Sequence, residues 1–339
     1  MRHPLPSVVL LFVSACVSAS GESGKTPALI TAQDAPFAEA TLDAAGHVTQ
    51  RLVAGEPAGG VYQAGSISKF ACTLVAMRLE NAELLKLDDT VAQLLPDYQG
   101  QAGRVTLRQL LSSRAGIRDG VIAAVQQDST LRSQEMTSME AVNRFATETT
   151  GDAPGTAFDY VITNWVVVQA ILETVSGVPL RDLMDEVLFT PAGADGAFIV
   201  EGVFGEENTV SVEGAALPVP SFVGCAGGLA VTPADLIALM RYPYTSGHLA
   251  PEQRRALQTV TSPEEHYTLG GRVVRMVGKD GEPRFVSWLS GSNGDWKTRA
   301  TYDPVTDTGH VALTASGESR GMEAARARWL EAMGLTVVD

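Results

Sequence analysis

Alternating apolar and polar positions predict β-strands at both ends of this chain. Near the start, residues 38–55 form two strand-like segments around a turn at Ala45-Gly46. Near the end, four strand-like segments, the last following a turn at Asp303-Pro304, cover residues 267–277, 284–290, 296–302 and 308–315. A segment of helical period, residues 322–334, closes the chain.

The segments between these strands have the pattern of helices. Residues 66–83 carry apolar side chains around most of a helical surface, and residues 107–113 form a shorter helical segment. Residues 163–177 are nearly all apolar and end at Gly177, as expected of a buried helix with a glycine cap. A further helix follows Thr232-Pro233. We therefore predict an α/β fold: one antiparallel sheet built from both termini and flanked by helices, with an all-helical lobe inserted at about 85–220.

The first residues have the pattern of an export signal. One arginine, Arg2, precedes a short apolar stretch that is too short to span a bilayer. Val13-Ser14-Ala15-Cys16 looks like the lipobox of bacterial lipoproteins, in which the cysteine carries the lipid. We expect a signal peptide at 1–15, a lipidated Cys16 with a tether at 16–37, and a catalytic domain at 38–339. The protein would then face the periplasm from a membrane anchor. The alternative is an ordinary signal peptide and a soluble periplasmic or secreted protein.

Charge and cysteine content exclude several classes of function. Lys and Arg number 25 against 39 Asp and Glu, a net charge of −14, which argues against binding nucleic acid. No spacing of His and Cys indicates a metal site, and no motif indicates a cofactor. An oxidising compartment would permit a disulfide between Cys72 and Cys225, but we expect them to lie apart as small core residues.

The strongest chemical motif is S-x-x-K at Ser66 and Lys69. Residues three apart share a helix face, so the two side chains can touch if a helix begins at Ser66. The positive end of that helix would favour a developing anion. A lysine withdrawn from water loses basicity and can accept the proton of a serine, which arginine cannot do. A solvated lysine beside an N-terminal serine is the alternative interpretation.

The amino-acid sequence around this motif resembles that of class C β-lactamases, DD-peptidases and family VIII carboxylesterases. The similarity extends from about residue 38 to the C-terminus, so it implies a β-lactamase/transpeptidase-like fold. The segments that carry it are 62–98, 106–111, 154–160, and 226–229 with Asp235.

The resemblance implies a role for each residue that matches a family motif. Tyr160 matches the tyrosine that shares proton transfer with the lysine, and it could act as a base only if a cation such as Lys69 lowered its pKa. The backbone N–H groups of Ser66 and Gly291 would form the oxyanion hole. Trp288, Ser290 and Asn164 would lie at the substrate, and Trp288 resembles the family VIII esterases.

Two motifs depart from the family pattern. Ile162 stands where the second motif, Y-x-N, has its asparagine, and Asn164 corresponds to a different asparagine of the family. The third motif, K-T-G or H-x-G, aligns with residues 288–290 and lacks its cation; the nearby Lys297 fits the surrounding match less well. These losses should weaken recognition of β-lactams more than acyl transfer to serine.

We therefore expect a serine hydrolase that forms an acyl-enzyme, most simply a carboxylesterase or an acyl-transfer enzyme acting on a small ester or amide. The first alternative is a DD-peptidase or β-lactamase with degenerate motifs. The second is an envelope binding protein in which catalysis has decayed. A Ser-His-Asp triad is not expected, because the chain has no G-x-S-x-G motif and its histidines lie at turns and strand ends.

Overall fold

A computed structural model describes residues 35–53, 60–202 and 218–338. The predicted signal peptide, Cys16 and most of the predicted tether lie outside these residues. In the described part of the chain, no helix is both long enough and apolar enough to span a bilayer.

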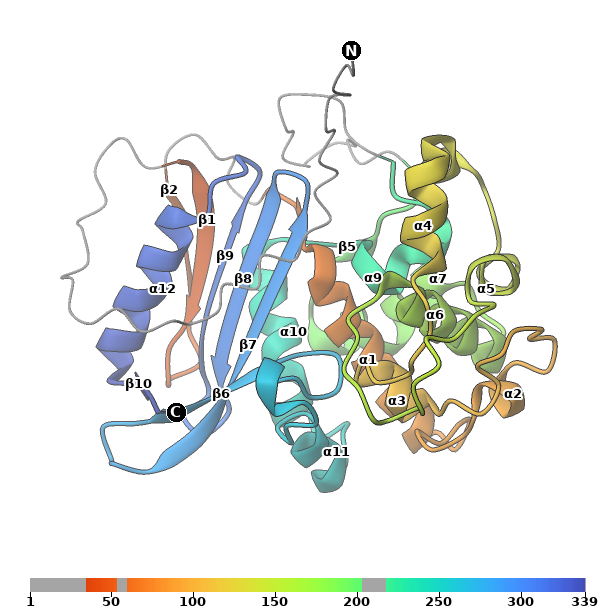
Figure 1. Cartoon of the computed structure of the whole chain (residues 1–339). Coiled ribbons are helices and arrows are strands. Elements are labelled where there is room, and N and C mark those ends of the chain that lie inside the picture. Colours follow the sequence, from red (N-terminus) through yellow and green to blue (C-terminus); the bar gives the residue numbers. More distant parts are fainter. Residues whose placement is uncertain (1–34, 54–59, 203–217, 339) are drawn as a thin grey trace, which may run out of the picture.

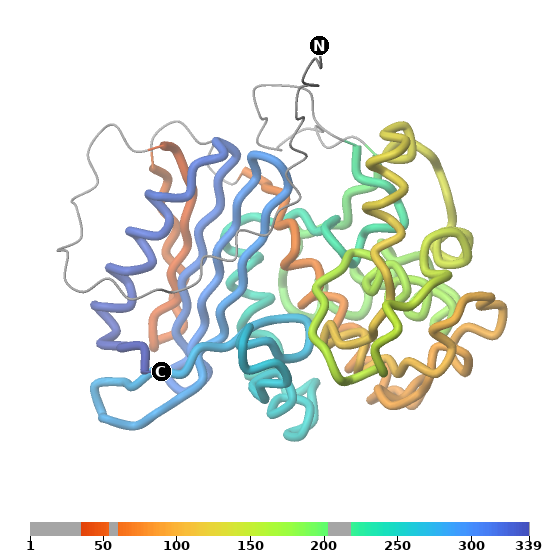
Figure 2. The backbone as a smooth tube through the Cα atoms, viewed as in Figure 1, coloured from red at the N-terminus to blue at the C-terminus, as the bar shows by residue number. Residues whose placement is uncertain are grey.

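The sheet joins the two ends of the chain, as predicted. Its seven antiparallel strands run in the order β10-β6-β7-β8-β9-β1-β2, so that β1 pairs with β9 (Figure 2). The strands are β1 (Phe37–Leu42), β2 (Val48–Val53), β6 (Val273–Val277), β7 (Pro283–Asn293), β8 (Trp296–Asp303), β9 (Thr308–Thr314) and β10 (Thr336–Val337). The segment predicted as a strand at 267–277 contains only β6, because residues 263–265 form a 3-10 turn and an irregular loop follows it.

One helix covers each face of this sheet. Helix α12 (Arg320–Met333) lies on the outer face, where Met322 and Trp329 are buried against the strands (Figure 1). Helix α10 (Pro233–Thr245) packs against the other face. A capping box formed by Thr232 and Asp235 fixes its start, because the Thr232 Oγ1 accepts the Asp235 N–H at 3.2 Å.

A lobe of helices lies beside the sheet and contains the helix that carries the S-x-x-K motif (Figure 1). The central helix α1 (Ser68–Asn81) buries eleven of its fourteen residues, as its apolar residues all round predict. The prediction for residues 163–177 is confirmed by α6 (Ile162–Ser176), which ends at Gly177 with a φ of +70°. The remaining helices are α2 (Val91–Leu94), α3 (Leu107–Leu111), α4 (Gly120–Gln127), α5 (Ser138–Phe145), α7 (Leu180–Met184), α8 (Thr190–Ala192), α9 (Gly224–Gly227) and α11 (Pro251–Ala256).

A second, three-stranded sheet lies between the main sheet and the helices. Its order is β3 (Tyr62–Gln63), β5 (Leu229–Val231) and β4 (Phe198–Ile199). Strand β3 leads directly into a 3-10 turn, η1 (Gly65–Ile67), and then into α1. This turn is the point at which the two layers meet, so Ser66 lies between the helical lobe and β7.

Candidate active site

Ser66 and Lys69 face each other across the first turn of this helical segment. Lys69 Nζ donates to Ser66 Oγ at 3.2 Å, as the three-residue spacing predicts. The lysine is only 2% exposed, and it also donates to the carbonyl oxygen of Ala226 in α9 at 2.6 Å. Two neutral oxygens therefore hold the amine in one orientation beside the serine hydroxyl.

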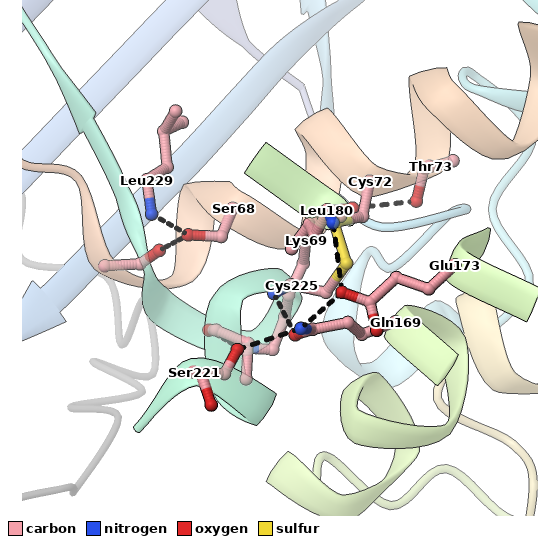
Figure 3. The surroundings of a disulfide bond; sticks show 12 residues. Ser68, Lys69, Cys72, Thr73, Gln169, Glu173, Leu180, Ser221, Cys225 and Leu229 are labelled. Carbon is pink, nitrogen blue, oxygen red and sulfur yellow. Dashed lines mark hydrogen bonds between the residues drawn. A yellow bond between two sulfur atoms is a disulfide. The ribbon is translucent and has the colours of Figure 1, made fainter. Parts of the chain in front are cut away.

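A disulfide fastens the helix of Lys69 to the helix of Ala226. Cys72 and Cys225 are bonded, with Cα atoms 5.6 Å apart, although the sequence separates them by 153 residues. The prediction that they lie apart as core residues is therefore wrong: α1 packs against α9, and the two cysteines face each other at that contact (Figure 3). Gln169 of α6 accepts the Cys225 N–H at 3.4 Å and helps to fix this segment.

Tyr160 lies over the lysine from the loop that precedes α6. Its ring centroid is 4.9 Å from Lys69 Nζ, and it lines the same cavity as Ser66. No hydrogen bond among the described residues involves the Tyr160 hydroxyl. Tyr267 packs edge-on against this ring at 6.0 Å, and burial, with the neighbouring Tyr160, raises the pKa of Tyr267. Tyr267 thus stays neutral and acts as packing for Tyr160.

The edge of β7 lies beside the serine. The Trp288 N–H donates to Arg272 O at 2.9 Å, on the side of β7 away from β8. In an antiparallel pair, every second residue points both backbone groups to the same side, so the N–H groups of Ser290 and Ser292 also point away from β8. A Cβ built on Gly65 would lie 2.7 Å from Ser292 N and 2.8 Å from Ser292 O, which places both groups next to the Ser66 turn.

This register corrects the predicted second oxyanion donor. The N–H of Gly291 points toward β8, and the N–H next to Ser66 is that of Ser292. Gly291 instead allows β7 to lie close to the backbone of Ala64, because a Cβ at position 291 would lie 1.8 Å from Ala64 O. The glycine of the third motif is therefore Gly291, which shifts the alignment to residues 289–291 and puts Leu289 at the position of the family's cation.

Trp288 does not lie at the cavity, where the family resemblance predicted it. Its side chain points to the outer face of the sheet, and its ring lies 5.1 Å from the guanidinium carbon of Arg326 in α12. Alternation along β7 explains this, because Val286, on the same face, packs with Trp329 of α12. Ser290 does line the cavity, as expected.

Asn164 is also absent from the cavity wall. It is fully buried in α6, and its Nδ2 donates to Asp159 O at 3.5 Å. It therefore supports the loop that carries Tyr160. At the expected place of the Y-x-N asparagine, Ile162 lines the cavity with an apolar side chain.

The cavity around Ser66 has a volume of about 330 Å³ and an uneven distribution of charge. On the side of the helical lobe its wall is apolar, with Val121, Ile122 and Val125 of α4. Among the described residues that line the cavity, the charged side chains are one carboxylate, Asp119, and five cations: Lys69, Arg132, Arg272, Lys297 and Arg299.

Sequence reasoning missed four of these cations as site residues: Arg132, Arg272, Lys297 and Arg299. Arg272 precedes β6, and its guanidinium lies 5.6 Å from the Tyr160 ring centroid. Lys297 of β8 donates to Ser292 Oγ at 2.8 Å and to Gly294 O at 2.7 Å. Neither Arg272 nor Lys297 belongs to a family motif that we could match. Arg272 lies just before β6 and Lys297 lies on β8, so only the pairing of these two strands with β7 brings the residues to the cavity. In the described residues, no three His, Cys, Asp or Glu side chains gather as metal ligands.

The relatives of this chain among known proteins include D-aminopeptidases and a penicillin-binding protein. The chain is 37% identical over 130 residues to a D-aminopeptidase of Cereibacter sphaeroides, which covers 38% of this chain and 24% of that protein. It is 26% identical over 218 residues to penicillin-binding protein 4 of Amycolatopsis lactamdurans, covering 60% of this chain and 55% of the relative. The chain thus spans about a quarter of the length of the D-aminopeptidase and about half that of the penicillin-binding protein.

Solved structures share the fold at lower identity. A D-stereospecific amidohydrolase from a Streptomyces species aligns with a TM-score of 0.72 at 20% identity, covering 85% of this chain and 93% of that one. A D-amino acid amidase from Ochrobactrum anthropi aligns with a TM-score of 0.71 at 16% identity, covering 88% and 95%. The model of the Beta-lactamase family matches residues 46–333, most of the chain. The chain therefore belongs to the Beta-lactamase family of serine hydrolases.

Proposed function

We propose that the protein hydrolyses a small ester or amide through an acyl-enzyme formed on Ser66. The observation that carries this proposal is the contact between Lys69 Nζ and Ser66 Oγ, 3.2 Å apart, at a cavity large enough for a small substrate. A buried lysine whose other partner is a carbonyl oxygen is positioned to exchange a proton with the hydroxyl.

The steps follow from the positions of these groups. Acting as the general base, Lys69 takes the hydroxyl proton while Ser66 Oγ bonds to the carbonyl carbon, and the carbonyl electron pair moves to its oxygen. The N–H groups of Ser66 and Ser292 are placed to stabilise that oxyanion. When the oxygen re-forms its double bond, the bond to the leaving group breaks and the proton passes to that group from Lys69 through Tyr160. Water then attacks the acyl carbon and gives its proton to Tyr160 and Lys69. The bond between the acyl carbon and Ser66 Oγ breaks, and the proton returns from Lys69 to Ser66.

Esters are the substrates that this site suits best. The amide and carboxylate of a β-lactam are bound in the family by an asparagine and a cation, and Ile162 and Leu289 stand at those positions. Acyl transfer itself needs only a nucleophile, its base and backbone donors, the roles that we assign to Ser66, Lys69 and the N–H groups of Ser66 and Ser292. A second candidate is hydrolysis of D-amino acid amides, which the 37% identity to a D-aminopeptidase favours.

Steady-state hydrolysis distinguishes these functions from a decayed scaffold. We expect release of 4-nitrophenol from 4-nitrophenyl butyrate, with kcat/KM about 10²–10⁴ times lower in Ser66→Ala and in Lys69→Met. A higher kcat/KM for D-alanine 4-nitroanilide would favour the second candidate, and a higher one for a chromogenic cephalosporin would favour a β-lactamase. Equal turnover by the parent protein and Ser66→Ala would refute the proposal.

We also propose that the protein is exported and anchored by a lipid on Cys16. The disulfide between Cys72 and Cys225 supports this location, because structural disulfides persist in oxidising compartments. Cys16→Ser should move the protein from the membrane fraction to the soluble periplasmic fraction. Retention of this variant in the membrane fraction would contradict the lipid anchor.

A further inference from the structure

We propose that Arg272, held in place by Glu265, is a positioning residue for Tyr160 and supports the transfer of a proton from its hydroxyl to the leaving group. This inference rests on the proposed acyl-enzyme function and adds a residue to its machinery. It starts from the surroundings of Tyr160. Among the residues that the structure describes, its hydroxyl has no hydrogen-bond partner, whereas its ring has close neighbours on several sides.

The guanidinium of Arg272 lies over two tyrosine rings. Its carbon is 5.6 Å from the ring centroid of Tyr160 and 5.2 Å from that of Tyr267. Tyr267 in turn packs edge-on against Tyr160, with 6.0 Å between the centroids. These distances are within the range of cation–π contacts. With Lys69 Nζ at 4.9 Å, two cations lie close to the ring of Tyr160.

Glu265 fixes the orientation of this guanidinium. Arg272 Nε donates to Glu265 O at 3.1 Å, and Nη2 donates to Glu265 Oε2 at 3.2 Å. The arginine side chain is 16% exposed and that of the glutamate is 30% exposed, so water offsets more of the carboxylate charge than of the guanidinium charge. Burial, with Tyr160, raises the pKa of Tyr267, and the charge of Arg272 acts against that rise. The positive charge therefore still acts on the rings beneath it.

A second arginine ties the loop of Tyr160 to the loop of Arg272. Arg114 Nη2 donates to Gly155 O at 2.7 Å, five residues before Tyr160. Its Nη1 donates to Thr261 O at 2.9 Å, in the segment that leads to Arg272. One side chain thus bridges two segments that are more than a hundred residues apart in the sequence, and it fixes the tyrosine and the guanidinium relative to each other.

The same segment is fastened to the turn of Lys69. Gly270 N donates to Leu111 O at 2.8 Å, and a Cβ built on Gly270 would lie 2.8 Å from Lys69 O. Arg272 O accepts the N–H of Trp288 in β7. The backbone beside Arg272 therefore contacts both the helix of the lysine and the strand beside the nucleophile, so the position of its side chain is set by the catalytic elements themselves.

The chemical consequence concerns departure of the leaving group. As the bond between the carbonyl carbon and the leaving oxygen breaks, that oxygen takes the hydroxyl proton of Tyr160, and Tyr160 takes a proton from Lys69. Negative charge develops on the tyrosine oxygen during this exchange, and a cation over the ring stabilises it. A fixed ring also keeps the hydroxyl within reach. Arg272 should therefore matter most for a leaving group that needs the proton.

The test compares two esters with the same acyl group. Phenyl butyrate releases a basic phenolate that benefits from protonation, whereas 4-nitrophenyl butyrate releases a weakly basic anion that can leave without a proton. The quantity measured is kcat/KM, because it reports the steps up to the first irreversible one, departure of the leaving group, and excludes deacylation. Partial unfolding of a variant lowers kcat/KM equally for both esters, so the ratio between them is independent of the folded fraction.

We expect Arg272→Gln to lower kcat/KM about tenfold for phenyl butyrate and about threefold or less for 4-nitrophenyl butyrate. Arg272→Lys should recover part of the loss on phenyl butyrate, because it keeps the charge. Glu265→Gln, a change at a more exposed side chain, should give a smaller loss with the same preference. Arg275→Gln is the matched control, since Arg275 is exposed on β6 and is not part of the cavity wall.

A double-mutant cycle tests whether Arg272 acts through the tyrosine hydroxyl. Tyr160→Phe keeps the ring and removes the proton. In that background Arg272→Gln should no longer lower kcat/KM for phenyl butyrate more than for 4-nitrophenyl butyrate. A selective loss that persists in Tyr160→Phe would overturn the assignment, because the arginine would then act by another route.

The outcomes for the two proposals are separate. If both esters are hydrolysed through Ser66 and Arg272→Gln lowers both values of kcat/KM equally, or lowers neither, this inference is wrong and the proposed function stands. If the parent protein hydrolyses both esters no faster than Ser66→Ala does, the proposed function is overturned together with this inference.

Discussion

Opening the disulfide between Cys72 and Cys225 should both destabilise the protein and impair its chemistry. The bond closes a loop across a sequence separation of 153 residues. In the chain-entropy treatment a loop of that length corresponds to about 5 kcal/mol, and measured disulfides typically contribute about 2–4 kcal/mol. We therefore expect reduction to lower the free energy of unfolding by about 2–5 kcal/mol.

The effect on chemistry follows from the neighbours of the bond. Cys225 is adjacent to Ala226, whose carbonyl accepts the Lys69 amine, and Cys72 is one helical turn after Lys69 (Figure 3). Without the bond, α1 and α9 can separate and Lys69 loses a fixed acceptor. We expect the reduced protein to show a lower kcat, and a shifted pH profile of kcat/KM, under conditions in which it remains folded.

The assay is urea unfolding with and without a thiol reductant, together with a count of free thiols. The double variant Cys72→Ala/Cys225→Ala is the control, since its unfolding midpoint should not respond to the reductant. The reasoning would be refuted by an unchanged midpoint in protein whose thiol count proves that the bond has opened. Free thiols at both positions in protein prepared under oxidising conditions would also refute it.

Three further predictions concern single side chains. Lys69→Arg should lose about as much kcat/KM as Lys69→Met, because arginine stays protonated and cannot accept the serine proton; near-normal hydrolysis of 4-nitrophenyl butyrate by Lys69→Arg would contradict this. Gly291→Ala should abolish acylation and lower the melting temperature, because the added Cβ would lie 1.8 Å from Ala64 O; normal turnover would argue against the close approach of β7. Asp159→Asn should raise the melting temperature at pH 7 but not at about pH 3. Burial, with the charges of Asp119 and Asp152, raises the pKa of Asp159. This carboxyl therefore stabilises the fold while it is protonated and loses that contribution as pH rises. An equal gain at both pH values would contradict the electrostatic cause.

The sequence predicted the parts of this site that depend on local spacing. Ser66 and Lys69 lie three residues apart, so one helical turn was enough to bring them together. The buried helix that ends at Gly177 followed from its apolar run and its glycine cap. The sheet built from both termini followed from the order of strand and helix patterns, supported by the family resemblance.

The parts that were missed depend on register and on contacts between distant segments. A shift of one residue along a strand moves a side chain to the other face, which is why Trp288 points to α12. For the same reason, the backbone N–H next to Ser66 is that of Ser292 instead of Gly291. Pairing of Cys72 with Cys225 requires α1 to pack on α9, which no local pattern encodes.

Mass spectrometry of the intact protein after exposure to an activated ester tests the central claim most directly. The cavity holds a second serine with a lysine partner, Ser292 with Lys297 at 2.8 Å, so Ser292→Ala is the matched control for Ser66→Ala. The account predicts one acyl adduct on the parent protein and on Ser292→Ala, and none on Ser66→Ala. An adduct that persists in Ser66→Ala, or that disappears only in Ser292→Ala, would contradict the assignment of Ser66 as the nucleophile.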